Sequence, residues 1–263
     1  MASLTISIIQ TKLFWENKKA NREMLEQKIK SISEKTEVVI LPEMFTTGFS
    51  MKPEVLAENM DGETMQWMKK IAAEKKIILT GSIIIEENGN YFNRLVWMLP
   101  NGQFAWYDKR HLFAYAEEHS HYTAGNKKLI ASVKGWKINL QICYDLRFPV
   151  WTRQTPGGSD LKYDLLINVA NWPEKRVIAW KTLLQARAIE NQCFVVGVNR
   201  VGQDGKEILY SGDSMIIDPL GEIIYQKNKE EDIFTYTLQK EKVNEVRSHF
   251  PFLNDADSFV INE

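Results

Sequence analysis

Three residues that could together perform acyl transfer each come at the end of a short apolar run. These residues are Glu43, Lys109 and Cys143, and each run is typical of a buried strand. In α/β sheets, ligands bind outside the carboxyl ends of strands, so side chains at those ends can converge on one site. A carboxylate, an ammonium and a thiol supply a base, a cation for the oxyanion and a nucleophile. The pattern therefore favours acyl transfer.

Cys143 lies in the sequence QICYDLRFP, where the apolar run gives way to polar residues. A thiol at a strand end, beside the free N–H of Tyr144 at the start of a turn, suits a nucleophile next to an oxyanion site. Only the thiolate attacks, so a base is needed, and Glu43 can serve if an apolar pocket raises its pKa. The alternatives are that Cys143 is a small core residue, Glu43 a solvated loop carboxylate and Lys109 a surface charge.

The second cysteine and the histidines suggest no further chemistry. Cys193 has apolar neighbours on both sides in NQCFVVGV, which predicts an inert core thiol. His119 and His121 resemble a metal pair, but no cysteine or carboxylate pattern completes a zinc site, so we expect no metal. His111 is expected to shape the loop after Lys109 rather than to pair with a cysteine.

The composition narrows the class of protein. The chain has 263 residues, of which 44% are hydrophobic and 25% charged, and 33 basic residues balance 34 acidic ones. This balance argues against binding to nucleic acid or to an anionic membrane surface. No apolar run approaches the roughly 18 residues of a membrane span, and the N-terminus lacks the pattern of a signal peptide. Two cysteines give no disulfide framework, which favours the reducing cytoplasm.

The apolar periodicity predicts an α/β fold in one domain over residues 1–263, with two layers of sheet and helices outside. A long loop is expected over 111–126 and another at 155–159, and the tail over 250–260 is expected to pack on the rest of the chain. The expected elements are strands over 4–10, 38–41, 77–85, 94–99, 104–107, 138–142, 164–169, 193–199, 215–218, 222–225 and 233–238, and helices over about 17–33, 61–74, 174–190 and 239–247.

Four segments in this order resemble the nitrilase superfamily, the carbon–nitrogen hydrolases. They are LPEMFTTGF around Glu43, YDKRHLF around Lys109, CYDLRFP around Cys143, and NVANWP followed by LLQARAIENQCFVVGVNRVG. The resemblance covers nearly the whole chain. It implies an α-β-β-α sandwich, two of which stack in a dimer, and a Glu–Lys–Cys triad at these three positions without a cofactor.

The family also has a second glutamate, seven residues before a glycine. Glu118 matches this spacing ahead of Gly125, and the adjacent Glu117 is the alternative. The resemblance further implies that Lys109 and the N–H of Tyr144 hold the oxyanion while Glu43 exchanges protons with the thiol and the leaving ammonia. Glu118 is then expected to orient Lys109 or the leaving group.

Within the superfamily, CYDLRFPVW, the EHSHYTAG segment and the chain length most resemble the ω-amidase-like branch. This resemblance implies hydrolysis of 2-oxoglutaramate or 2-oxosuccinamate, small ω-amides of 2-oxo dicarboxylic acids. An N-carbamoyl amine or a nitrile is an alternative substrate, and a non-catalytic binding partner is a third interpretation.

A small anionic substrate requires a cation and several hydrogen-bond donors. Arg176 is the candidate for the carboxylate, because a guanidinium can bind both oxygens, and Tyr115 is a candidate donor. Arg147 is expected instead to form a structural ion pair behind the nucleophile. The remaining candidates are aromatic residues that would wall the pocket or belong to the core, namely Phe45, Phe113 and Trp172.

Overall fold

The computed structural model describes residues 2–154 and 163–261, so the loop expected at 155–159 lies outside the described residues. Its strands are β1 (Ser3–Gln10), β2 (Val38–Ile40), β3 (Ile78–Glu87), β4 (Asn90–Met98), β5 (Phe104–Asp108), β6 (Ile130–Val133), β7 (Trp136–Ile142), β8 (Leu165–Val169), β9 (Phe194–Val198), β10 (Val201–Gln203), β11 (Leu209–Ile217), β12 (Ile223–Asn228) and β13 (Asp232–Gln239). Its α-helices are α1 (Lys18–Lys30), α2 (Pro53–Leu56), α3 (Glu63–Lys75), α4 (Glu118–His121), α5 (Pro149–Thr152), α6 (Val177–Asn191) and α7 (Lys240–His249). Short 3₁₀-helices are η1 (Ala114–Ala116), η2 (Cys143–Arg147), η3 (Glu174–Arg176) and η4 (Phe252–Asp255).

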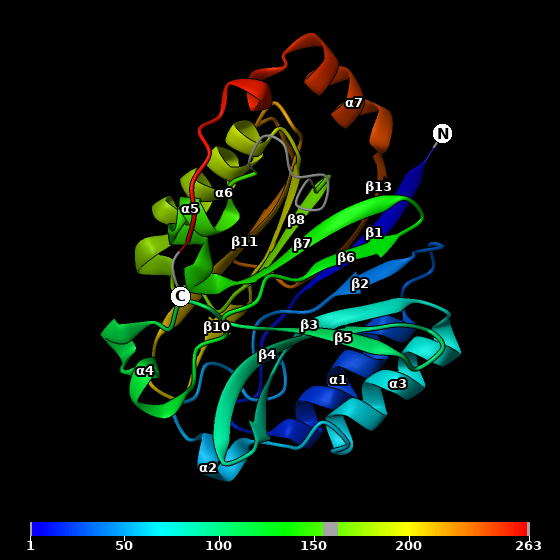
Figure 1. Ribbon diagram of the computed structural model, residues 1–263. Helices are drawn as coiled ribbons and strands as arrows, with labels where there is room; N and C mark the ends of the chain where they lie inside the picture. Colours follow the sequence, from blue (N-terminus) through cyan, green and yellow to red (C-terminus); the bar gives the residue numbers. More distant parts are fainter. Residues whose placement is uncertain (1, 155–162, 262–263) are drawn as a thin grey trace.

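Two mixed β-sheets stack face to face (Figure 1). The first has the order β13-β1-β2-β3-β4-β5, and the second has the order β10-β11-β9-β8-β7-β6 with β12 also paired to β11. In each sheet three neighbouring strands are parallel, β1-β2-β3 in the first and β7-β8-β9 in the second. Parallel neighbours require crossover connections, and α1 and α6 are the helices of two of these crossovers.

The core forms between the sheets because inward positions alternate along each strand. Leu4, Ile6 and Ile8 of β1 face the same cluster as Ile138 and Leu140 of β7, and all five side chains are fully buried. Residues of the opposite parity, such as Ile9, instead pack toward the helices. This alternation follows from the two-residue period of a strand and makes each sheet apolar on both faces.

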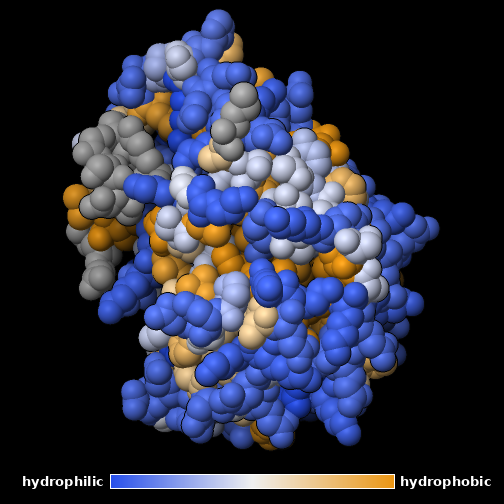
Figure 2. Space-filling model, turned by 90° about the vertical axis from the view of Figure 1, so that its right-hand side faces the viewer, coloured by the Kyte–Doolittle hydropathy of each residue, from blue (hydrophilic) through white to orange (hydrophobic). Residues whose placement is uncertain are grey.

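Helices cover the outer faces of the sheets. Leu25 of α1 and Met68 of α3 are buried against the first sheet, and Trp180 and Leu184 of α6 are buried against the second. Hydrophilic residues cover most of the lower part of the face in Figure 2, where the outer surfaces of α1 and α3 lie. The predicted α-β-β-α sandwich is thus confirmed. No helix in the described ranges is long and apolar enough to cross a membrane.

Most expected elements are present, with differences at their ends. The helix expected from residue 174 begins as η3 and becomes α-helical at Val177, and β11 starts at Leu209, earlier than expected. The elements α2, β6 and β10 were not predicted, because runs of three or four residues show no period. The long loop over 111–126 contains η1 and α4. In the tail, Leu253 packs on the protein as expected, but Phe252 and Val260 are exposed.

Candidate active site

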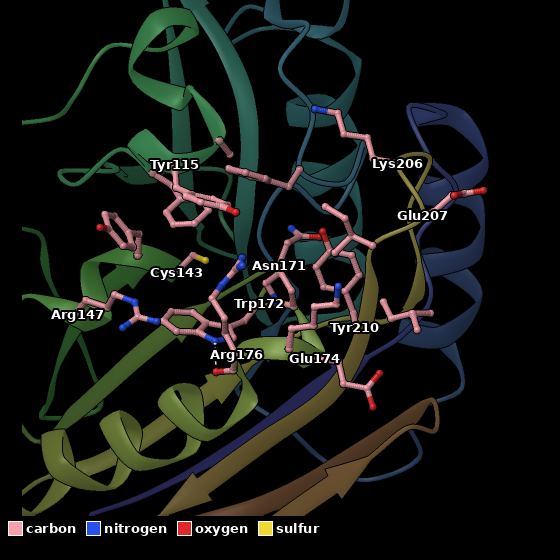
Figure 3. Close-up of a pocket in the computed structure, with 18 residues that line it drawn as sticks. Tyr115, Cys143, Arg147, Asn171, Trp172, Glu174, Arg176, Lys206, Glu207 and Tyr210 are labelled. Atoms are coloured by element: carbon pink, nitrogen blue, oxygen red, sulfur yellow. Dashed lines mark hydrogen bonds between the residues drawn. The ribbon is translucent and has the colours of Figure 1, made fainter.

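The ends of three strands bring the predicted triad together where the two sheets meet. Glu43 follows β2 and Lys109 follows β5, both in the first sheet, and Cys143 follows β7 in the second. Glu43 and Lys109 are both fully buried, and the Nζ of Lys109 donates to Glu43 Oε1 over 3.0 Å. Cys143 opens onto a cavity between the sheets' ends (Figure 3).

The second glutamate of this cluster is Glu118. Its carboxylate accepts hydrogen bonds from Lys109 Nζ at 3.0 and 2.9 Å and from the backbone N–H of Phe113 at 2.6 Å. Glu118 is fully buried, whereas Glu117 is exposed and has a left-handed backbone with φ of 59°. Of the two alternatives, Glu118 is therefore the residue that faces Lys109.

Two asparagines complete the contacts of Glu43. Asn93 Nδ2 donates to Glu43 Oε1 over 2.8 Å and lies 3.4 Å from Glu118 Oε1. Asn171 donates its backbone N–H to Glu43 Oε2 over 2.7 Å and its Nδ2 to the Glu43 carbonyl over 2.6 Å. Neither role was predicted from the sequence. Asn171 could have been found, because it follows β8 as Cys143 follows β7, but Asn93 lies within β4 and carries no such signal.

Cys143 has an unusual backbone conformation. Its φ of 45° lies in the left-handed region, which is strained for a residue with a side chain. The buried carboxylate of Asp145 holds the turn by accepting from the N–H of Ile142 at 3.1 Å and from the Tyr107 hydroxyl at 2.7 Å. His111 also contacts Asp145, with Nδ1 2.8 Å away, and stacks on Phe148. His111 therefore braces this turn.

The electrostatics keep the thiol protonated beside a base. Burial raises the pKa of Cys143 well above its ordinary value, and the charge of Glu43 and a hydrogen bond to it act in the same direction. Burial lowers the pKa of Lys109, but the carboxylates of Glu118 and Glu43 outweigh it, so the net shift is upward. Burial raises the pKa of Glu118, with Lys109 opposing. This arrangement can pass a proton from sulfur to Glu43 beside a permanent ammonium.

The cavity at Cys143 has a volume of about 780 Å³ and contains most of the predicted substrate residues. Trp172, Phe113 and Tyr115 form part of its wall, and Tyr144 also lines it. In Figure 3 the Arg176 guanidinium points toward Cys143, and it lies 5.2 Å from the centre of the Phe113 ring.

Arg147 was expected to form a structural ion pair, but it forms none with the residues that the structure describes. Its guanidinium instead lies 5.0 Å from the centre of the Trp172 ring and lines the cavity. Within the described ranges, neither Arg147 nor Arg176 lies within ion-pair distance of a carboxylate. Both cations are therefore available to an anion in the cavity.

Phe45 does not line the cavity, so its predicted role in substrate binding is wrong. Its ring is fully buried in the layer between the first sheet and the helices, 5.9 Å from the ring of Trp67. The chain turns after Pro42, and the N–H of Phe45 donates to the Ser82 carbonyl, which directs the ring away from Cys143. The missing side chain at Gly81 leaves room for it, because a Cβ there would lie 2.8 Å from the ring.

The second cysteine lies apart from the cavity. Cys193 is fully buried in the core beneath α6, and burial raises its pKa. Among the described residues, no group of three or more histidine, cysteine, aspartate or glutamate side chains is arranged to hold a metal ion.

A family model described as carbon-nitrogen hydrolase matches residues 5–248. The chain belongs to this family. The carbon-nitrogen hydrolase is 40% identical over 260 residues to "Omega-amidase YafV" of Escherichia coli (strain K12), covering 98% of this chain and 99% of the relative. It is 34% identical to the "2-oxoglutaramate amidase" of Bacillus subtilis (strain 168), covering 95% and 96% of the two chains.

A solved structure agrees with the fold over its whole length. XC1258 from Xanthomonas campestris, a CN-hydrolase superfamily protein with an arsenic adduct in its active site, has a TM-score of 0.96 and 44% identity, with both chains fully covered. The resemblance to the nitrilase superfamily and its ω-amidase-like branch is thus confirmed. This carbon-nitrogen hydrolase is an enzyme that acts on carbon–nitrogen bonds.

Proposed function

We propose that this hydrolase releases ammonia from the ω-amide of a short 2-oxo dicarboxylic acid, 2-oxoglutaramate or 2-oxosuccinamate. The observation that carries the proposal is a buried Glu43–Lys109 pair, joined by Glu118, next to a thiol whose cavity also holds Arg176, an arginine with no ion pair to a described side chain. The relatives named omega-amidase and 2-oxoglutaramate amidase, which match over nearly the full length, support the choice of substrate.

The first half of the reaction forms a thioester. Cys143 Sγ attacks the amide carbonyl carbon while Glu43 takes the thiol proton. Lys109 and the backbone N–H of Tyr144 stabilise the negative oxygen of the tetrahedral intermediate, as preorganised donors do in oxyanion sites. Glu43 then returns its proton to the amide nitrogen, the carbon–nitrogen bond breaks, and ammonia leaves.

The second half of the reaction regenerates the enzyme. Glu43 removes a proton from water, the hydroxide adds to the thioester carbonyl, and the carbon–sulfur bond breaks to release the carboxylic acid. The departing sulfur recovers the proton from Glu43. Through its contacts with Lys109 Nζ, Glu118 orients the ammonium in both halves of the cycle.

Arg176 binds the carboxylate at the far end of the substrate. Its guanidinium points toward Cys143 in Figure 3 and has no acidic partner among the described side chains, so an incoming carboxylate meets an uncompensated cation. Arg147, Lys175 and Lys206 also line this cavity, as do the carboxylates Glu174 and Glu207, so basic side chains outnumber acidic ones there. Phe113 and Trp172 shield the acyl chain from water, whereas the Tyr115 side chain is 85% exposed and cannot contribute to this.

The proposal is tested by ammonia release from a panel of 2-oxoglutaramate, 2-oxosuccinamate, glutamine, an N-carbamoyl amine and a simple nitrile. We expect turnover of the two 2-oxo amides and little of the others. Turnover of the carbamoyl amine or the nitrile instead would be consistent with the triad but would contradict the proposed substrate. No turnover of any compound, with Cys143 inert to thiol reagents, would favour a non-catalytic role.

We further infer that residues 1–263 form one hydrolase domain that acts in the cytoplasm as a homodimer. The two sheets share one core, and the family model spans both, which supports a single domain. The exposed apolar side chains Val150 of α5, Ile178 and Ile189 of α6, and Phe252 support self-association on that side of the sandwich. Sedimentation velocity is expected to give a dimer, and a monomer at micromolar concentration would contradict this.

A further inference from the structure

Asn93 joins the two carboxylates of the site from within a strand. It is fully buried on β4, and its carbonyl accepts the backbone N–H of Lys109 over 3.0 Å. Its Nδ2 donates to Glu43 Oε1 over 2.8 Å and lies 3.4 Å from Glu118 Oε1. One amide group thus contacts the same two carboxylates that Lys109 Nζ contacts.

The hydrogen bonds of Asn93 are not those of a residue that serves stability alone. Its Oδ1 is buried and has no hydrogen-bond partner within the described parts of the chain. A buried acceptor without a partner opposes folding, and a leucine of similar size would avoid that cost. The contacts of Nδ2 with the carboxylates account for an asparagine at this position.

The donors around Glu43 distinguish its two oxygens. Oε1 accepts from both Asn93 Nδ2 and Lys109 Nζ, which together occupy its two lone pairs. Among the described nitrogen donors, Oε2 accepts only the backbone N–H of Asn171, at 2.7 Å, so one lone pair remains. The remaining lone pair of Oε2 can therefore accept the proton from Cys143.

We propose that Asn93 is a positioning residue that links Glu43 to Glu118 and fixes the Glu43 carboxylate so that Oε2 receives the thiol proton. This inference rests on the proposed role of Glu43 as the base. The donated hydrogen bond favours the charged form of a carboxylate, and Asn93 provides it without adding charge.

The charged and titratable groups around Glu43 stay in place when Asn93 is replaced. Lys109, Glu118 and Cys143 face it directly, and the hydroxyls of Tyr122 and Tyr210 lie close enough to feel its charge. Substituting leucine for Asn93 removes one donor to Glu43 Oε1 and leaves all these groups in place, so a changed pH dependence of Cys143 reactivity can be assigned to the loss of that donor.

The experiment measures the rate of Cys143 alkylation by iodoacetamide as a function of pH, in wild type, Asn93→Leu and Asn168→Leu. Asn168 is a matched control, because it is a fully buried asparagine on β8 whose side-chain atoms have no partner among the described residues. We expect the acid limb of the Asn93→Leu profile to move to higher pH by about half a unit or more. The Asn168→Leu profile should match the wild type.

An acid limb that stays in place in Asn93→Leu, with the rate lowered equally at every pH, would overturn the inference. Asn93→Ser, which is smaller and loses the bridge, provides a second variant if the leucine variant does not fold, and the same shift is expected. The assay measures alkylation of the thiol and does not require turnover of the ω-amide. Wild-type Cys143 that is inert at every pH would overturn the proposed function, so the two failures are distinguishable.

Discussion

At the scale of single residues, the site depends on buried charges that stabilise one another. Glu43, Glu118 and Lys109 are all fully buried, and each carboxylate lies within about 3 Å of the ammonium. Buried ions are strongly unfavourable unless they are paired and hydrogen-bonded, so the removal of one member leaves the others uncompensated. The same contacts set where each proton and each positive charge resides during the reaction.

Replacing Glu118 with glutamine tests its role as a positioning residue. The amide keeps the size of the side chain but removes the negative charge that faces Lys109 Nζ at 2.9 Å. We expect kcat for 2-oxoglutaramate to fall about 10²-fold, comparable to the loss of an oxyanion donor, with a smaller change in KM. Steady-state kinetics measures both.

Glu117→Gln is the matched control for that substitution. Glu117 is exposed and adjacent in sequence, so its variant should retain wild-type kinetics. Full activity in Glu118→Gln, or equal losses in the two variants, would contradict the assignment of Glu118.

At the scale of elements, the strand ends explain which site residues the sequence could predict. Glu43, Lys109 and Cys143 each follow a strand that an apolar run predicts. Because the ends of such strands converge, the three side chains could be predicted to share one site. Asn93 lies inside β4, where a buried asparagine looks like any other inward position. Phe45 was misassigned because a sequence cannot show toward which side a chain turns after a strand.

Cys143 follows β7 and Cys193 precedes β9, and the two thiols occupy different environments, which leads to a second prediction. Cys193 precedes β9 and is packed beneath α6, away from the cavity. Cys193→Ala should lower the free energy of unfolding by about 1–3 kcal/mol through lost packing, with turnover per folded molecule unchanged. Urea unfolding with an activity assay of the folded protein measures both effects. A loss of turnover at unchanged stability would show that Cys193 takes part in the chemistry.

At the scale of the whole molecule, the closely packed sandwich predicts a loss of stability at alkaline pH. Burial raises the pKa of Cys193, Tyr107 and Tyr163 in the folded protein above their ordinary values. Above about pH 8.5 for cysteine and pH 10 for tyrosine, the unfolded chain loses these protons while the folded protein keeps them. Because the unfolded state then binds fewer protons, the free energy of unfolding falls as pH rises.

Urea unfolding at pH 7.5, 9 and 10.5 measures this dependence. The free energy of unfolding should be greatest at pH 7.5 and decline across the series. A constant value would mean that these side chains ionise in the folded protein and that the core admits water.

The central claim is that Cys143 forms a thioester during the hydrolysis of an ω-amide. The most direct measurement is mass spectrometry of enzyme quenched by acid during turnover of 2-oxoglutaramate, with peptide mapping and parallel ammonia assay. We predict an acyl adduct on the peptide that contains Cys143, and neither adduct nor ammonia from Cys143→Ala. Ammonia release by Cys143→Ala, or an adduct at another residue of the wild type, would contradict the account.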